Sequence, residues 1–499
     1  MRGALAGLGL LASLLPKSRH ASVHSSVSSA RFSVPVAAGS GVLKVLGSGE
    51  LKVPRREALR LASTVALGGA ACNLYPARAA EPIEESGPSK TADRRYGPLL
   101  QGPFDFPSAS RATVRRELAS GRIWSFEQVQ GVIYVQVPVR MTVVKLESGG
   151  LFVYAPIAPT VECLRLLTEV EAEHGAVTHI LLPTLAIEHK SFAGAFADAR
   201  PKAQLWVAPA QYSFPVDLPL ALTGFPRNVK RLPADDAAES VPWASQLPYR
   251  TLEPLREKVG AFQEVVVFDR PSGTLLVTDL VCSLPSEPPA ILVANDLRAL
   301  LYHSRDEPTD VPVDTPEARA IGWKKICLFA CYFQSSPLVV PAEPDGTLAG
   351  AARFFRAAFS PDMPAAGRVL GWAGFFAWRW RPEWRGAFDA LRGGGRPFVP
   401  PILQELVLSR EPDRVLSFAE RVANDFKFTS ILPAHFEPVV AGPREWLDAF
   451  RPFGPTGINY PGALPEADLG FLRQFERQLV DSGTIRPRVR PQLPSSPLA

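Results

Sequence analysis

The stretch Val177-Thr-His-Ile-Leu-Leu-Pro-Thr-Leu-Ala-Ile-Glu-His-Lys-Ser-Phe-Ala-Gly194 decides how the rest of the chain is interpreted. Its first six residues are apolar and rich in β-branched side chains, which predicts a buried strand over 177–182. Pro183 ends that strand because it has no N–H to donate to a sheet. A short loop then presents two adjacent metal-capable side chains, Glu188 and His189, before a helix predicted near 191–199.

The segments around this stretch predict an alternation of strands and helices. Runs rich in β-branched and aromatic residues predict strands at 132–137, 141–146, 150–155 and 204–208. Thr160 is placed to cap a helix with an apolar face. A hairpin is predicted at 262–268 and 274–281, with Pro271 and Gly273 in its turn. This order of elements predicts an α/β fold whose first part covers 103–290.

The second half of the chain is predicted to be mainly helical before one last strand. Most segments within 291–424 have helical patterns, and an apolar strand at 428–432 then leads into Pro433-Ala-His435. This last strand and the helices after it occupy 425–485 in our division of the chain. The proline-rich end, 486–499, is predicted to be a disordered tail.

Composition and charge limit the classes of function. The chain has 499 residues, of which 46% are hydrophobic, so it can form a large core. Its net charge of +5 comes from residues 1–79, which contain 10 basic and 2 acidic residues. The remainder has 44 basic and 47 acidic residues, so the folded part is not basic. A nucleic-acid partner is therefore not expected.

The N-terminal region has the composition of targeting segments. Residues 1–49 contain no acid and are rich in Ser, Ala and Arg, which is the composition of a chloroplast or mitochondrial transit peptide. Paired arginines, an apolar run and Ala77-Arg-Ala79 then look like a twin-arginine thylakoid signal over 55–80, and 81–102 has the composition of a linker. The two signals in tandem resemble the bipartite leaders of plastid proteins bound for the thylakoid lumen, which implies a plastid transit peptide over 1–54 and a chloroplast protein of the lumen. One ordinary transit peptide, and hence the stroma, is the alternative.

Three predicted strand ends carry side chains that can bind a metal. They are Glu188 and His189, then Asp279 after the hairpin, and His435 after the last strand. An aspartate buried without a partner would cost several kcal/mol, so Asp279 needs a cation or good hydrogen bonds. Two imidazoles and two carboxylates suit one divalent zinc, manganese or iron(II) ion. The alternative is that each of these residues is a polar group satisfied by its neighbours.

The 177–194 stretch resembles the metallo-β-lactamase superfamily, whose motif is His-x-His-x-Asp-His followed by a Gly. Laid on this chain, the two leading histidines fall on Thr184 and Ala186, and the Asp-His pair falls on Glu188 and His189. No histidine occurs between Lys190 and Thr278 to complete a first metal site. The resemblance, over 130–282 and 425–452, implies a degenerate member that keeps only the second metal site: Glu188, His189, Asp279 and His435.

That resemblance also implies a fold class: an α/β, metallo-β-lactamase-like αββα sandwich with a long helical insertion, 291–424, before the last core strand. More narrowly, the phrases at 151–160, 188–190, 207–215 and 322–325 are similar to a family of plants, algae and cyanobacteria called domain of unknown function 4336. This second resemblance covers most of 100–455 and implies no established activity.

Two functions remain open from the sequence. The first is a mononuclear metal-dependent hydrolase that uses metal-activated water on a small ester, thioester or phosphodiester. The second is a catalytically inactive binding or assembly factor in the chloroplast, whose protein partner would contact the helical insertion. The aromatic run 372–380 could contact the thylakoid membrane surface, although such runs more often pack in a core.

Overall fold

The computed structural model describes residues 91–94, 111–132, 135–212, 219–222, 224–258, 260–307, 310–339, 379–454 and 462–489. The two predicted targeting segments, 1–80, lie outside these residues, as does the predicted linker except for the short 3-10 helix η2 (Thr91–Arg94). No helix among the described residues has the length and hydropathy needed to cross a membrane.

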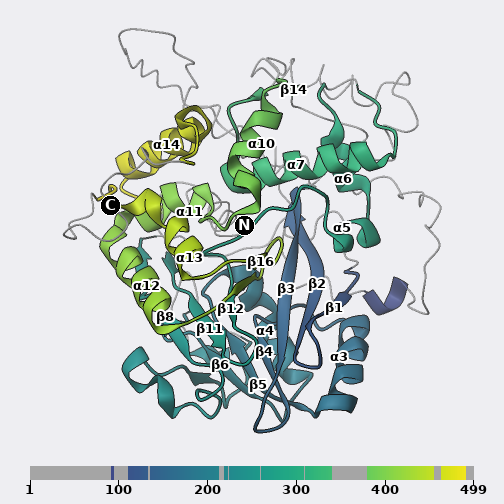
Figure 1. Cartoon of the computed structure of the whole chain (residues 1–499), viewed down its shortest axis with the longest axis vertical. Coiled ribbons are helices and arrows are strands. Elements are labelled where there is room, and N and C mark those ends of the chain that lie inside the picture. The colour runs from purple at the N-terminus through teal and green to yellow at the C-terminus, as the bar shows by residue number, and fades with distance from the viewer. Residues whose placement is uncertain are drawn as a thin grey trace, which may run out of the picture. The chain divides into compact units, whose positions relative to one another are not determined.

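Seven strands form a first sheet in chain order (Figure 1). They are β1 (Val114–Ala119), β2 (Ile123–Val132), β3 (Val135–Lys145), β4 (Leu151–Tyr154), β5 (Val177–Leu182), β6 (Gln204–Val207) and β7 (Lys230–Arg231). The pairs from β1 to β4 are antiparallel, and those from β4 to β7 are parallel. Two helices, α3 (Val161–His174) and α4 (Ile187–Asp198), connect the parallel strands β4, β5 and β6. Thr160 caps α3 as predicted, because its Oγ1 accepts the N–H of Cys163 at 3.1 Å.

The separate strands predicted at 132–137 and 141–146 are one long strand, β3, that continues through Pro138. Proline is normally excluded from central strands because it cannot donate a ladder hydrogen bond. Here β3 pairs with β4 only over Thr142–Lys145, so the part around Pro138 has β2 as its only strand partner. The N–H of Arg140, two residues along and on the same edge of β3, donates to the Ala434 carbonyl oxygen and not to β2, so the N–H that Pro138 lacks would also face away from the β2 ladder. The prediction of two separate strands was therefore wrong.

A second sheet of five strands has the order β16-β15-β12-β11-β8. Its members are β8 (Tyr249–Thr251), β11 (Val265–Asp269), β12 (Thr274–Val277), β15 (Ser430–Pro433) and β16 (Val439–Val440). β12 and β15 are parallel, and the other neighbours are antiparallel. Two small ribbons complete the strands: β9 (Leu255–Glu257) with β10 (Gly260–Phe262), and β13 (Leu338–Val339) with β14 (Arg379–Trp380).

The remaining helices lie mainly on the second sheet and at one end of both sheets (Figure 1). The α-helices are α5 (Ala290–Asn295), α6 (Arg298–Ser304), α7 (Pro316–Tyr332), α10 (Trp384–Arg392), α11 (Pro401–Leu406), α12 (Pro412–Asp425), α13 (Pro443–Ala449) and α14 (Glu466–Asp481). The other 3-10 helices are η4 (Leu220–Leu222), η5 (Asp235–Ser240), η7 (Gly393–Gly395), η8 (Leu408–Arg410) and η9 (Arg451–Phe453). Six of the α-helices, α5 to α12, lie between β12 and β15 in the chain, where the sequence predicts the insertion.

Three hydrophobic cores separate four layers. The first core joins the outer face of the seven-stranded sheet to α3 and α4, through residues such as Leu167 and Phe196. The second lies between the two sheets and contains Phe152, Val265 and Leu276. The third joins the five-stranded sheet to the later helices. This helix–sheet–sheet–helix order confirms the predicted αββα fold class.

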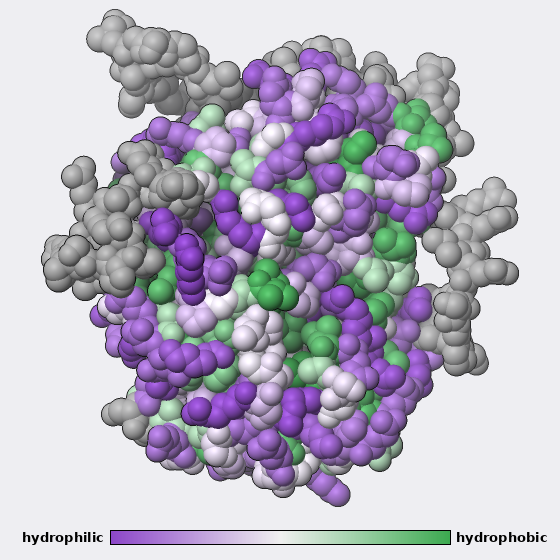
Figure 2. Space-filling view, viewed as in Figure 1, coloured by the Kyte–Doolittle hydropathy of each residue, from purple (hydrophilic) through white to green (hydrophobic). Residues whose placement is uncertain are grey.

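The aromatic run 372–380 is described only at its end, because 372–378 lie outside the described residues. Trp380 is buried and pairs with Leu338 across the β13–β14 ribbon, so it faces the interior. On the face shown in Figure 2, hydrophobic residues are scattered among hydrophilic ones. Such scattered exposure is ordinary for a protein surface.

Candidate metal centre

His189 and Glu188 lie in the first turn of α4, which begins at Ile187 and not near 191 as predicted. The N-cap position is Ala186, whose side chain makes no capping hydrogen bond, so the sequence lacks the usual mark of a helix start. Successive residues on a helix point about 100° apart. Glu188 and His189 therefore point in different directions. In the loop that the sequence predicted for them, their side chains would not have been separated in this way.

Asp279 lies in the turn directly after β12, where a buried carboxylate holds the backbone. Glu264 accepts the N–H groups of Thr278 at 2.7 Å, Asp279 at 3.0 Å and Leu280 at 2.9 Å. Burial and the charge of Asp279 raise the pKa of Glu264 to about 7. Three backbone donors on one buried carboxylate fix the turn that carries Asp279.

His435 follows β15 and is held by residues of β3 in the other sheet. Its Nδ1 donates to the carbonyl oxygen of Pro138 at 2.9 Å. Arg140 donates to the carbonyl oxygens of Pro433 and, at 2.6 Å, of Phe436, so it grips the loop on both sides of the histidine. Phe436 has a φ of 61°, a left-handed conformation that is uncommon for a residue other than glycine. The hydrogen bond from Arg140 supports this conformation next to His435.

The structure brings together His189, Asp279 and His435 from three distant parts of the chain. Each offers one ligand atom, and these atoms lie within 4.8 Å of one another. Asp279 Oδ1 is 3.1 Å from His435 Nε2 and 3.9 Å from His189 Nε2. The three residues are 0%, 2% and 3% exposed. Three of the four residues predicted as ligands therefore converge.

The hydrogen bonding of the two imidazoles fits a bound cation. His435 donates through Nδ1, so in its neutral form Nε2 carries a lone pair that faces the Asp279 carboxylate. Two acceptors this close repel each other unless a proton or a metal ion lies between them. Neither ring nitrogen of His189 has a hydrogen-bond partner among the described residues. Buried polar atoms without partners are costly, and a metal ion would satisfy them.

The local electrostatics agree with this arrangement. Burial alone would raise the pKa of Asp279, but the adjacent imidazoles of His189 and His435 hold it well below its ordinary value. Burial also lowers the pKa of His435, which favours its neutral form. An ionised carboxylate beside neutral imidazole is the protonation state that metal binding requires.

Glu188, the fourth predicted ligand, lies outside the group of three. It is buried, and neither of its carboxylate oxygens has a hydrogen-bond partner among the described residues. Its ligand atoms are not among those that lie within 4.8 Å of one another. The direction imposed by the first turn of α4 separates it from His189.

The positions aligned with the missing histidines form ordinary protein hydrogen bonds. Thr184 is buried, its Oγ1 accepts the N–H of Ala186 at 3.1 Å, and its carbonyl oxygen accepts Gln211 Nε2 at 3.1 Å. Thr184 also forms an isolated β-bridge with Glu264. The described residues at these positions therefore form hydrogen bonds within the protein itself.

Three other histidines lie outside the centre. His174 packs its ring on Trp124 with the centroids 4.7 Å apart, and His179 lies on β5. His303 is buried on α6, where its ring packs against Tyr302 and Phe329 in an aromatic cluster.

Sequence reasoning missed Glu264 and Arg140, the two residues that hold the ligand loops. In the sequence, each of them is a charged residue beside or within an apolar run that is typical of a strand. Glu264 precedes Val265-Val-Val-Phe, and Arg140 lies between Val139 and Met141. A charge in such a run must find a buried partner, which was a usable indication.

Several solved structures resemble this one at low identity. The DIM-1 metallo-β-lactamase is 10% identical over 34% of this chain and 72% of its own, with a TM-score of 0.26. The FIM-1 metallo-β-lactamase from Pseudomonas aeruginosa, in its mono-zinc form, is 10% identical over 33% of this chain and 67% of its own, with a TM-score of 0.26. A flavoprotein from Thermotoga maritima is 10% identical over 69% of this chain and 62% of its own, with a TM-score of 0.34.

No curated protein matches the sequence. One family profile matches the chain from the end of β1 through β15 to the helix after His435. The matched region includes His189, Asp279 and His435. The profile is that of a domain of unknown function, DUF4336, and it matches residues 120–452, more than half of the chain. The protein belongs to the DUF4336 family.

Proposed function

We propose that the protein binds one divalent transition metal through His189, Asp279 and His435 and hydrolyses an ester, thioester or phosphodiester of a small molecule. The observation that carries this proposal is the convergence of three buried ligand atoms within 4.8 Å. The donor set of two imidazoles and one carboxylate suits zinc, manganese or iron(II).

The residues of the chain have distinct parts in this proposal. Asp279 supplies negative charge, and His189 and His435 each supply one imidazole nitrogen; burial lowers the pKa of His435, which favours its neutral form. The Pro138 carbonyl fixes the His435 tautomer that leaves Nε2 available. When bound, the ion is a Lewis acid that polarises a carbonyl or phosphoryl oxygen. Glu188 is the nearest further carboxylate along the chain and lies outside this ligand set.

Metal analysis of the protein purified without a chelator tests the binding step. We expect about one equivalent of metal, because the described residues contain one such group of ligands. His189→Ala and Asp279→Ala should each lose it, while Glu188→Gln should keep it. His179→Ala is the matched control, because His179 lies on β5 outside the group. Metal-free wild-type protein, or equal metal in every variant, would contradict the proposal.

Activity is tested with model substrates of the three ester classes. The wild-type protein should hydrolyse at least one class, and Asp279→Ala should remove that activity together with the metal. A protein that holds its metal but hydrolyses none of the substrates would refute the hydrolase and leave the second candidate.

The second candidate is an inactive binding or assembly factor, and the enclosure of the centre favours it. All three ligands are at most 3% exposed, and structural metal sites are closed whereas catalytic sites keep an open position. In this case the metal would stabilise the fold. Its removal would lower the unfolding temperature without any activity to lose.

We also propose a location in the chloroplast, in the thylakoid lumen, with the stroma as the alternative. The acid-free composition of 1–49 and the arginine pair Arg55-Arg56 support this proposal. A fluorescent fusion carrying Arg55→Lys and Arg56→Lys should stay in the stroma. An unchanged lumenal position would exclude twin-arginine transport, and an unchanged stromal position would exclude the lumen.

A further inference from the structure

We propose that Glu264 is a positioning residue that sets the separation of His189 and Asp279. The inference rests on the proposed metal site, because these two residues are its ligands from different sheets. It assigns Glu264 no contact with metal or substrate. Its role would be to join the segment leading to His189 to the turn that carries Asp279.

The backbone around Glu264 is bonded to the loop that precedes His189. Val265 N donates to the Pro183 carbonyl oxygen at 2.8 Å, and Glu264 pairs with Thr184 in a β-bridge. Five residues after Thr184, along the start of α4, lies His189. The main chain at Glu264 is therefore hydrogen-bonded to the segment that leads from β5 of the first sheet to His189.

The side chain of Glu264 is hydrogen-bonded to the turn after β12, in the second sheet, which carries Asp279. One oxygen accepts the Thr278 N–H, and the other accepts those of Asp279 and Leu280. Both carboxylate oxygens are used, and the residue is fully buried. A single residue therefore connects the two ligand-bearing segments, by its backbone on one side and its carboxylate on the other.

The third ligand, His435, is held by different atoms. Its loop is bonded to Pro138 and Arg140 of β3 and, through the N–H of Ala434, to the Val277 carbonyl oxygen of β12 at 2.9 Å; none of these bonds involves the Glu264 carboxylate. Loss of the Glu264 carboxylate should therefore disturb Asp279 relative to His189 and leave the loop at 433–436 in place. This difference within one centre makes the role of Glu264 separable from general stability.

The principal variant is Glu264→Gln, which keeps the side-chain volume but replaces one acceptor oxygen with an amide donor. That donor would face backbone N–H groups, so one or two of the three bonds are lost. We expect cobalt(II), added to metal-free protein, to bind about 10–100-fold more weakly, as for other groups that orient metal ligands. The visible bands of the cobalt(II) protein should also shift, because they report the arrangement of the ligands.

Glu162→Gln is the matched control, since buried Glu162 accepts the N–H of Thr113 at 2.7 Å away from the centre. It should leave cobalt(II) affinity and spectrum unchanged. If Glu264→Gln does not fold, Glu264→Asp keeps the charge but shortens the arm, and it should weaken cobalt(II) binding as well. Wild-type affinity and spectrum in the folded variant would overturn the inference.

Amide hydrogen exchange of metal-free protein separates this inference from the proposed function. In Glu264→Gln the amides at 278–280 should exchange at least about tenfold faster, while those at 433–436 stay protected. Wild-type protein that binds no metal would refute the proposed function and, with it, the role of Glu264 in positioning ligands. Metal binding by the wild-type protein together with unchanged exchange at 278–280 in Glu264→Gln would refute the inference alone.

Discussion

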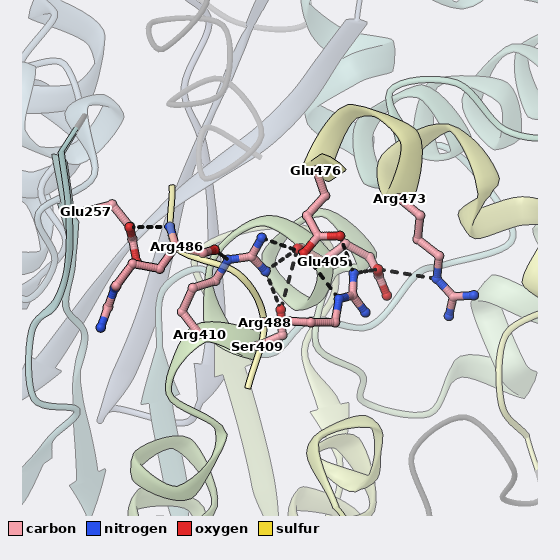
Figure 3. Close-up of polar contacts among 8 residues, drawn as sticks. All are labelled: Glu257, Glu405, Ser409, Arg410, Arg473, Glu476, Arg486 and Arg488. Carbon is pink, nitrogen blue, oxygen red and sulfur yellow. Dashed lines mark hydrogen bonds and ion pairs between the residues drawn. The ribbon is translucent and has the colours of Figure 1, made fainter. Parts of the chain in front are cut away.

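Two sets of arginine–glutamate pairs in this protein differ in burial and in what they hold. Beside the metal centre, Arg140 pairs with Glu127 at 2.9 Å, and both side chains are at most 1% exposed. Nearer the C-terminus, the network in Figure 3 joins Arg486 and Arg488 to three other segments. Arg486 and Arg488 are 51% and 40% exposed, although Arg410 in the same network is buried against Glu476.

The C-terminal network binds the start of the region predicted to be a disordered tail. Arg486 pairs with Glu257 at 2.8 Å, and Arg488 contacts Glu405 at 2.6 Å and Glu476 at 2.9 Å (Figure 3). Residues 486–489 therefore have specific partners, and 490–499 lie outside the described residues. The proline content of 486–499 predicts a disordered tail. Composition alone gives no information on ion pairs with glutamates that are distant in the chain.

The comparison shows that an arginine–glutamate pair contributes differently to stability in the buried and in the exposed environment. The buried pair is shielded from water and salt, so removal of one partner leaves an unpaired charge in the interior. The pairs of the half-exposed Arg486 are reached by water and salt, so they are screened and gain little over hydration in the unfolded chain. We therefore expect the site to depend on Arg140 far more than the C-terminal segment depends on Arg486.

The largest effect is expected for Arg140→Met. This variant leaves Glu127 with only the partly exposed Arg116 and removes the bonds to the loop around His435. The free energy of unfolding should fall by about 3 kcal/mol, as when a buried ion pair loses one partner. Urea denaturation of metal-free protein measures this.

The control for this variant is Arg115→Met, because Arg115 pairs with Glu169 on the surface. It should change the free energy of unfolding by less than about 1 kcal/mol. Equal losses in the two variants would break the distinction between buried and exposed pairs.

The second effect concerns pH. Burial would raise the pKa of Glu127, but Arg140 and Arg116 outweigh it and hold the pKa below 4.5. The stabilisation from Glu127 is therefore present above pH 4.5 and is lost as the pH falls through the folded pKa. The wild-type advantage over Glu127→Gln should grow with rising pH, by at most about 1.4 kcal/mol per pH unit.

In the Arg140→Met background this slope should become shallower. Arg116 still lowers the pKa of Glu127, but burial is opposed by one arginine and not by two, so the pKa is lowered less and ionised Glu127 stabilises the fold less. Denaturation midpoints measured between about pH 3 and pH 7 compare the two slopes. The same slope in both backgrounds would mean that Arg140 does not control Glu127.

The smallest effect is expected for Arg486→Ala. It removes the pairs with Glu257 and Glu411, in which Arg486 is half-exposed. The loss should be below about 1 kcal/mol at low salt and should disappear near 1 M salt. Thermal unfolding at the two salt concentrations measures it, and a larger, salt-independent loss would show that this network behaves like the buried pair.

The sequence predicted the strand at 177–182, the cap at Thr160 and three of the residues that converge as candidate ligands. The strand and the cap follow from local periodicity and capping chemistry, whereas the set of candidate ligands came from their residue types and from the family resemblance. It predicted wrongly at Pro138 and at the start of α4. Around Pro138 the strand depends on neighbours that are distant in the chain. At α4 the helix begins without a side-chain cap, so the sequence does not mark its first residue.

By itself, the sequence determined which residues have the chemistry to bind a metal and which elements carry them. Only the tertiary structure decided that His189 joins Asp279 and His435 while Glu188 does not, because adjacent residues of a helix turn point about 100° apart. It also decided that Glu264 and Arg140 hold the ligand loops. Arg140 is almost 300 residues away from the loop that it grips, and contacts at that separation arise only when the two sheets pack together.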